Sequence, residues 1–210
     1  LLSGTISNRV DVVGVATDDA TKSYVSPQKR MWQYPHSAAE EEMVSLLADR
    51  AGVEVFKGRV KTDEFYDLIE HSWKPDLCIM ATFGQKIDER LFSWPRLGFF
   101  NLHPCIDDRW PSAYAGPNPF RALLDDHAEY ARIAMHRVNH DFDAGDLIAY
   151  SDKLYIPEHA SVIDLHKMTS PFAGRLAAVE IERIIDLAGR AEIDLDGASA
   201  GALRTESCCQ

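Results

Sequence analysis

The sequence lacks the segments that would attach it to a membrane or export it. No apolar run approaches the roughly 20 residues of a membrane-spanning helix, and the chain does not begin with the basic region, apolar core and cleavage site of a secretory signal. The four cysteines show no CxxC spacing, and Cys208 and Cys209 are adjacent, which argues against a disulfide framework. We therefore expect a soluble, cytoplasmic protein with no membrane partner.

Basic residues are scarce relative to acidic ones. Lys and Arg total 22 against 33 Asp and Glu, which gives a formal net charge of −11. Proteins that bind nucleic acids usually need the opposite balance or a strong basic stripe. The single small basic cluster, "PQKRMW" at 27–32, is interpreted as a solvated loop, so we expect no nucleic-acid partner.

Motifs for a metal or a phosphate group are also absent. No helical HExxH is present, although "MHRVNHDFD" brings His136, His140 and Asp143 close together in the sequence. Gly58 and Gly116 are isolated, so no glycine-rich phosphate loop is visible. We expect that no metal is needed.

What the sequence does contain is the alternation of strands and helices typical of an α/β fold. With 210 residues and 46% hydrophobic content there is enough apolar material for one domain with a full core. Strands are expected at 10–16, 53–56, 76–82, 97–103, 131–138 and 146–152, the last two as an antiparallel pair, and helices near 38–52, 62–72 and 161–188. This predicts a mostly parallel twisted sheet with flanking helices, a catalytic domain over residues 1–188 and a C-terminal tail over 189–210.

The first residues are typical of the last turn of a helix that leads into the strand at 10–16. Leu1 is not a methionine, and "LLSGTISNR" offers no strand of its own. We therefore expect a strand and most of a helix to be missing before Leu1. The sequence carries no indication of the oligomeric state.

The stretch "FFNLHPC" places two polar side chains at the end of an apolar strand. Asn101 and His103 are two residues apart, so an extended chain points both to the same side. Pro104 has no N–H and is expected to end the strand at His103. In an open parallel α/β sheet, ligands bind at the carboxyl ends of the strands.

Asn101, His103 and Asp143 together supply the parts of an acyl-transfer site. An amide can donate to an oxyanion, a histidine can hold or move a proton, and a carboxylate can orient that histidine. The alternative is that Asn101 and His103 are merely hydrogen-bonded loop anchors. Cys105 could be a nucleophile activated by His103, but a packed thiol is the simpler interpretation.

The loop "DRWPSAYAGPNPF" is rich in aromatic residues and proline. Trp110, Tyr114 and Phe120 could form a substrate wall, or the loop could be a rigid cover on the core. Both interpretations stay open at the sequence level.

Four segments in order resemble the successive motifs of the 10-formyltetrahydrofolate-dependent formyltransferase family. They are "PDLCIMATFGQKIDERLF", "LGFFNLHPC", "YAGPNPFRALL" and "HRVNHDFDAGDLI", and the resemblance extends from about Val10 to Ala188. Its most specific part is Asn-x-His-Pro at a strand end, followed downstream by Asp-x-Gly. The resemblance implies a Rossmann-like core and 10-formyltetrahydrofolate as co-substrate.

The resemblance also assigns residues to roles. Asn101, His103 and Asp143 match the family's catalytic trio. The segments that hold the pterin match Phe83, Gly84, Gln85 and Ile87 and the loop Asn139, His140 and Asp141. Cys105 replaces the family's usual serine, Tyr130-Ala131 replaces a Thr-Gly, the family's Leu-Leu-Pro is absent and the loop to Gly116 is longer. From that loop we expect Arg109, Trp110 and Tyr114 to bind the acceptor.

The implied activity is N-formyl transfer from 10-formyltetrahydrofolate to the amine or hydroxylamine of a small metabolite. Candidate acceptors are an amino-sugar nucleotide, an ornithine-type siderophore precursor and glycinamide ribonucleotide. A methionyl-tRNA acceptor is disfavoured by the net charge. The alternatives are a formyltetrahydrofolate hydrolase, which would use water as acceptor, and a non-catalytic folate-binding protein.

Overall fold

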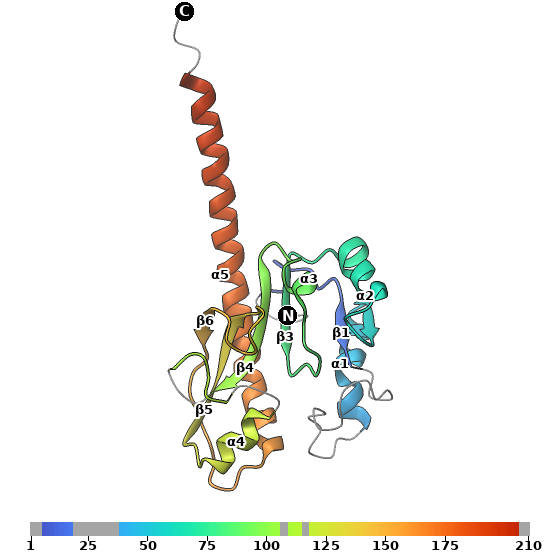
Figure 1. Ribbon diagram of the computed structural model, residues 1–210, viewed down its shortest axis with the longest axis vertical. Coiled ribbons are helices and arrows are strands. Elements are labelled where there is room, and N and C mark those ends of the chain that lie inside the picture. Colours follow the sequence, from blue (N-terminus) through green and yellow to red (C-terminus); the bar gives the residue numbers. More distant parts are fainter. Residues whose placement is uncertain (1–5, 19–37, 106–108, 115–117, 206–210) are drawn as a thin grey trace, which may run out of the picture.

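The computed structural model describes residues 6–18, 38–105, 109–114 and 118–205, which form two sheets with flanking helices (Figure 1). The strands are β1 (Val15–Thr17), β2 (Val55–Lys57), β3 (Leu77–Ala81), β4 (Gly98–Cys105), β5 (Tyr130–Arg137), β6 (Leu147–Tyr150) and β7 (Leu154–Tyr155). The helices are α1 (Ala38–Arg50), α2 (Asp63–Asp67), the π-helical turn η2 (Leu68–Trp73), α3 (Glu89–Phe92), α4 (Pro119–Asp125) and α5 (Val162–Thr205).

The strand pairings give an α/β fold with mixed sheets. β1 pairs with β2 in parallel, and β3 pairs with β4 in parallel. β5 then pairs antiparallel with β4, with β6 and with β7. The α/β class and the antiparallel β5–β6 pair are as the sequence predicts, and the parallel pairings are confined to the first four strands. β1 is shorter than expected, because its ladder with β2 covers only Val15–Thr17.

β4 continues through Pro104, so the prediction that the strand ends at His103 was wrong. Pro104 lies opposite Ile133, whose backbone N–H donates to Ser151 Oγ and whose carbonyl accepts from the Ser151 N–H. Pro104 and Ile133 therefore face each other without sharing hydrogen bonds. In antiparallel sheets such non-hydrogen-bonded pairs alternate with hydrogen-bonded pairs. The proline nitrogen faces the other side, where pairing with β3 has already ended at Leu102.

The core beneath the site fixes β4 and β5 against α5. Phe100 and Met135 are fully buried and pack with Leu176 and Ala177 of α5. Burial of a side chain of this size stabilises the fold by about 1.5–3 kcal/mol. The two strands that carry the site are thus held by a well-packed layer.

The long helix α5 extends further than the sequence predicts. It was expected to end near Ala188 but continues through Gly189 to Thr205, as the red ribbon in Figure 1 shows. A glycine inside a helix costs only about 1 kcal/mol relative to alanine, and Gly189 does not have the positive φ that would end the helix. The boundary between a domain at 1–188 and a tail at 189–210 stays a prediction.

Among the described helices, none combines the length and the apolar character that crossing a membrane requires.

Candidate active site

Asn101 is the centre of a buried polar cluster. It lies in β4, opposite Met80 of β3 and His136 of β5, and its side chain is 7% exposed. Its Nδ2 donates to Asp143 Oδ1 at 3.1 Å and lies 3.2 Å from His136 Nε2. Both amide hydrogens therefore have acceptors inside the protein.

Asp143 reaches this cluster from the turn between β5 and β6. Its backbone adopts a left-handed conformation with φ of 50°, which aspartate tolerates better than most residues. Two residues later, a Cβ on Gly145 would lie 1.8 Å from the Arg137 carbonyl oxygen, so only glycine fits this close approach. The turn thus holds the Asp143 carboxylate over β4.

His103 faces an oxygen acceptor at each ring nitrogen. Nε2 lies 3.0 Å from the Tyr114 carbonyl oxygen, which can only accept, so this nitrogen carries a hydrogen. Nδ1 lies 3.6 Å from Asp143 Oδ2, and catalytic hydrogen bonds of this kind are often long before substrate binds. The His103 ring therefore lies between the Tyr114 carbonyl and the Asp143 carboxylate.

His136 belongs to the same cluster, which the sequence did not reveal. Its Nδ1 lies 3.0 Å from the Arg137 carbonyl oxygen and must donate to it, so in the neutral ring Nε2 accepts from Asn101. Burial lowers the pKa of His136, against smaller raising effects from Arg137 and Asp143. His136 is thus held neutral, with a lone pair aimed at the Asn101 amide.

The histidine cluster that suggested a metal site is divided by the fold. His136 Nε2 lies 3.8 Å from Asp143 Oδ1, but His140 is exposed, with its ring edge-on to Phe92 and Nε2 3.7 Å from Glu89 Oε2. Within the described part of the chain no three His, Cys, Asp or Glu side chains form a group that could hold an ion. The geometry gives no support to the metal interpretation.

Cys105 is fully buried at the end of β4. A nucleophile must reach substrate, so this position favours the packed-thiol interpretation over the nucleophile.

The segment predicted to bind the pterin follows β3. The Gly84 N–H donates to Asp18 Oδ2 at 3.1 Å, and Gln85 Nε2 donates to Asp18 Oδ1 and to the Gly58 carbonyl. Ile87 is buried in the core beside Phe83. Gln85 and Ile87 therefore make contacts inside the protein that hold this loop in place. Any contact of the loop with pterin stays a prediction.

The second predicted pterin segment follows β5. Asn139 Oδ1 accepts from the Asp141 N–H at 2.9 Å, which closes a tight turn. His140 contacts α3, which directly follows the first segment. The two segments are thus linked through α3.

The loop 109–114, which the sequence predicts to bind the acceptor, contacts the cluster. Trp110 packs on His136 with ring centroids 4.8 Å apart, and its indole N–H donates to the Gly145 carbonyl at 2.6 Å. Tyr114 contributes its backbone carbonyl to His103, while its hydroxyl donates to Asp126. Arg109 is exposed. The two acidic residues before it in this loop, Asp107 and Asp108, lie outside the described residues.

Known proteins resemble this chain in sequence and in fold. The family model for formyl transferase matches residues 1–176. The methionyl-tRNA formyltransferase of Macrococcus caseolyticus is 30% identical over 115 residues, which cover 54% of this chain and 34% of that protein. The chain thus spans about a third of that relative's length.

Two solved structures show the same fold. The phosphoribosylglycinamide formyltransferase of Streptococcus pneumoniae superposes with a TM-score of 0.59 at 15% identity, covering 82% of this chain and 98% of that chain. A formyltetrahydrofolate deformylase from Pseudomonas syringae gives 0.50 at 16% identity, covering 64% and 47%. Because the family model matches most of its length, the chain belongs to the formyl transferase family.

Proposed function

We propose that this protein transfers a formyl group from 10-formyltetrahydrofolate to the amine of a small acceptor. The observation that carries the proposal is the buried convergence of Asn101, His103 and Asp143, in which the Asn101 amide donates to Asp143 at 3.1 Å and His103 lies 3.6 Å from the same carboxylate. This is a hydrogen-bond donor, a proton carrier and an orienting carboxylate in one place.

The folate co-substrate supplies the activated formyl carbon, and the protein supplies position and charge. The acceptor nitrogen forms a bond to that carbon while the bond to N10 breaks. As negative charge develops on the formyl oxygen, Asn101 donates to it from Nδ2. Such a donor typically lowers the barrier by about 3–4 kcal/mol.

Asn101 must exchange a partner to do this, since both amide hydrogens are engaged in the structure. In this proposal Asn101 breaks its hydrogen bond to Asp143 and turns that amide hydrogen to the formyl oxygen. Asp143 then takes a proton from the attacking amine. His103 shares that proton through Nδ1 and passes it to the leaving nitrogen. The second amide hydrogen of Asn101 stays hydrogen-bonded to His136 throughout.

The acceptor proposed is a small amine: an amino-sugar nucleotide, an ornithine-type siderophore precursor or glycinamide ribonucleotide. The net charge of −11 supports this over a nucleic acid. A methionyl-tRNA acceptor is the second candidate, because the Macrococcus caseolyticus relative is named for that activity. Water is the acceptor in the hydrolase alternative.

The test is an acceptor panel with 10-formyltetrahydrofolate, in which tetrahydrofolate release is followed optically with EDTA present throughout. The three small amines, methionyl-tRNA and buffer alone are compared. Release of tetrahydrofolate that occurs only when one of the small amines is present supports the proposal. Release with methionyl-tRNA alone favours the second candidate, equal release in buffer favours hydrolysis, and donor binding without release favours a non-catalytic folate-binding protein.

A further inference from the structure

The side-chain nitrogen of Asn101 has two acceptors, and only one of them keeps that role during the proposed reaction. Asp143 Oδ1 lies 3.1 Å from Nδ2, and His136 Nε2 lies 3.2 Å from it. An ionised carboxylate can only accept hydrogen bonds, whereas a protonated one also donates. Once Asp143 has taken the proton of the attacking amine, it no longer requires the nitrogen, rather than the oxygen, of the Asn101 amide to face it.

His136 is the acceptor whose role does not change. Its Nδ1 lies 3.0 Å from the Arg137 carbonyl oxygen, and because a carbonyl oxygen only accepts, the ring hydrogen is on Nδ1. In the neutral ring Nε2 then has a lone pair and no hydrogen. It can bond to the nitrogen of the Asn101 amide but not to the oxygen. His136 therefore determines which end of the amide faces it for as long as the ring is neutral.

The packing around His136 keeps its ring in this orientation and uncharged. The side chain is 3% exposed, and Trp110 packs on the ring with centroids 4.8 Å apart. Leu147 of β6 lies opposite His136 in the sheet. Burial lowers the pKa of His136 and outweighs the Asp143 carboxylate, whose Oδ1 lies 3.8 Å from Nε2. The ring is therefore neutral near neutral pH.

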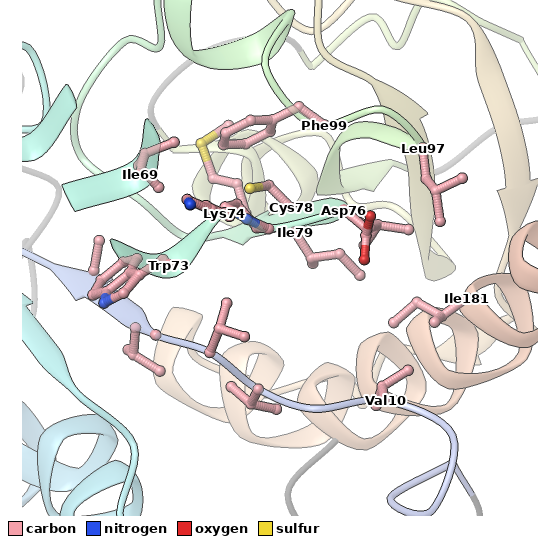
Figure 2. Close-up of a pocket in the computed structure, with 18 of the residues that line it drawn as sticks. Val10, Ile69, Trp73, Lys74, Asp76, Cys78, Ile79, Leu97, Phe99 and Ile181 are labelled. Atoms are coloured by element: carbon pink, nitrogen blue, oxygen red, sulfur yellow. The ribbon is translucent and has the colours of Figure 1, made fainter. Parts of the chain in front are cut away.

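The cavity beside β3 does not border this cluster. It has a volume of about 770 Å³ and is lined by residues of β1 and β3, and Figure 2 shows Cys78, Ile79 and Phe99 beside it. Its lining includes none of the four side chains of the cluster, Asn101, His103, His136 and Asp143. Water in this cavity therefore cannot replace His136 as the acceptor of the Asn101 hydrogen.

We propose that His136 is a positioning residue for formyl transfer, whose Nε2 lone pair keeps the nitrogen of the Asn101 amide, rather than the oxygen, turned into the site. While that bond holds, the other hydrogen on the same nitrogen is directed first at Asp143 and then at the formyl oxygen. An amide turned by half a rotation would present its oxygen to the developing negative charge and repel it. This inference rests on the proposed function, because it gives His136 a part in the same reaction.

Replacing His136 with and without an acceptor tests the proposal. His136→Leu is expected to lower kcat about tenfold or more while the KM values for both substrates stay nearly unchanged, because the amide acts on charge that develops only in the transition state. His136→Gln is expected to restore most of this loss, since its side-chain oxygen can accept the same hydrogen. His159→Leu and His159→Gln, at an exposed position, are the matched controls.

Two kinetic outcomes would overturn the proposal. One is a folded His136→Leu protein with wild-type kcat, and the other is a His136→Gln protein that is folded and as slow as His136→Leu. Thermal unfolding shows whether each variant keeps the fold.

NMR of the histidine ring nitrogens tests the arrangement without any activity, and it decides the matter if His136→Leu does not fold. The His136 signals are identified by their absence from His136→Gln. At pH 7.5 they are expected to show a hydrogen on Nδ1 and none on Nε2, with an Nε2 shift that changes in Asn101→Ala. A hydrogen on Nε2 would overturn the proposal. A ring in the expected state, in a protein that formylates no amine, would refute the proposed function and with it the role of His136 in transfer, while the hydrogen bond to Asn101 would stand.

Discussion

The Asn101 amide nitrogen holds the buried polar cluster together, because it contacts both Asp143 and His136. All the partners are nearly inaccessible to solvent, and a buried polar network of this kind is stable only when its members satisfy one another. The same property makes the cluster sensitive to single substitutions. The roles of its members can therefore be separated by replacing one side chain at a time.

Asn101→Ala, His103→Ala and Asp143→Ala are each expected to lower kcat by about 100-fold or more, since each removes a group that acts on the developing charge or the transferred proton. Steady-state kinetics measures the effect, and thermal unfolding shows whether the fold is kept. His159→Ala, an exposed histidine, is the control and should be neutral. A folded variant of the trio with nearly wild-type kcat would refute that residue's role.

His136 makes a pH-dependent contribution to stability. Because its pKa is lowered in the fold, the unfolded chain binds this proton more readily than the native protein does. Stability is therefore full above the ordinary pKa of about 6.5 and falls as the pH drops below it, by up to about 1.4 kcal/mol per pH unit.

His136→Gln is expected to remove this loss, since glutamine can accept from Asn101 without titrating. Urea unfolding at pH 7.5, 6 and 5 measures the free energy of unfolding, with His159→Gln as the matched control. A wild-type protein and a His136→Gln variant that lose equal stability on acidification would show that His136 is not the titrating group.

The convergence of Asn101, His103 and Asp143 could be predicted from the sequence, whereas the part that His136 plays in the cluster could not. Asn101, His103 and Asp143 stand in a recognisable order along the chain. His136 joins them only because β4 and β5 pair antiparallel with Asn101 opposite His136, and that register depends on how two strands align in space. From the sequence alone, without this register, His136 is grouped with its neighbour His140. In the fold, His140 lies against Phe92 and Glu89 instead.

At the scale of elements, the turn between β5 and β6 positions Asp143. Its geometry depends on Gly145, where the backbone approaches the Arg137 carbonyl too closely for any side chain. The sequence showed Asp-x-Gly but not the reason for the glycine. Similarly, β4 could not be followed past Pro104 from sequence, because only the partner strands reveal that the missing N–H faces an unpaired side.

Gly145→Ala is expected to destabilise the protein by about 1–3 kcal/mol and to lower kcat, because the turn must move and Asp143 moves with it. Gly174→Ala is the matched control: Gly174 lies within α5 with open space around its Cβ position, so alanine should stabilise by about 0.5–1 kcal/mol. Thermal unfolding and kinetics measure both. A stable and active Gly145→Ala protein would contradict the role of the turn.

The loop 109–114 is expected to select the acceptor. Arg109→Ala and Trp110→Ala should raise the KM for the amine while leaving that for 10-formyltetrahydrofolate nearly unchanged, since the donor is expected beside Phe83 and Ile87. Separate titration of the two substrates measures both constants. Equal changes in the two KM values, or a loss of thermal stability with no change in either, would assign the loop to covering the core.

For the whole molecule, two observations bear on the reaction: the family to which the chain belongs and its net charge. The family match points to formyl transfer, and the net charge of −11 opposes binding to a phosphate backbone. The α/β class followed from the alternation of elements in the sequence. The separation into two sheets did not, because it depends on which strands lie side by side.

The most direct test of the central claim follows an isotopic label on the formyl carbon of 10-formyltetrahydrofolate. The account predicts that the label appears on the nitrogen of the amine acceptor in the same amount as tetrahydrofolate is released, and that Asn101→Ala, His103→Ala and Asp143→Ala each slow its appearance about 100-fold or more. Label recovered as free formate at a rate independent of the amine would contradict transfer. Undiminished labelling of the acceptor by all three variants would show that the chemistry takes place elsewhere.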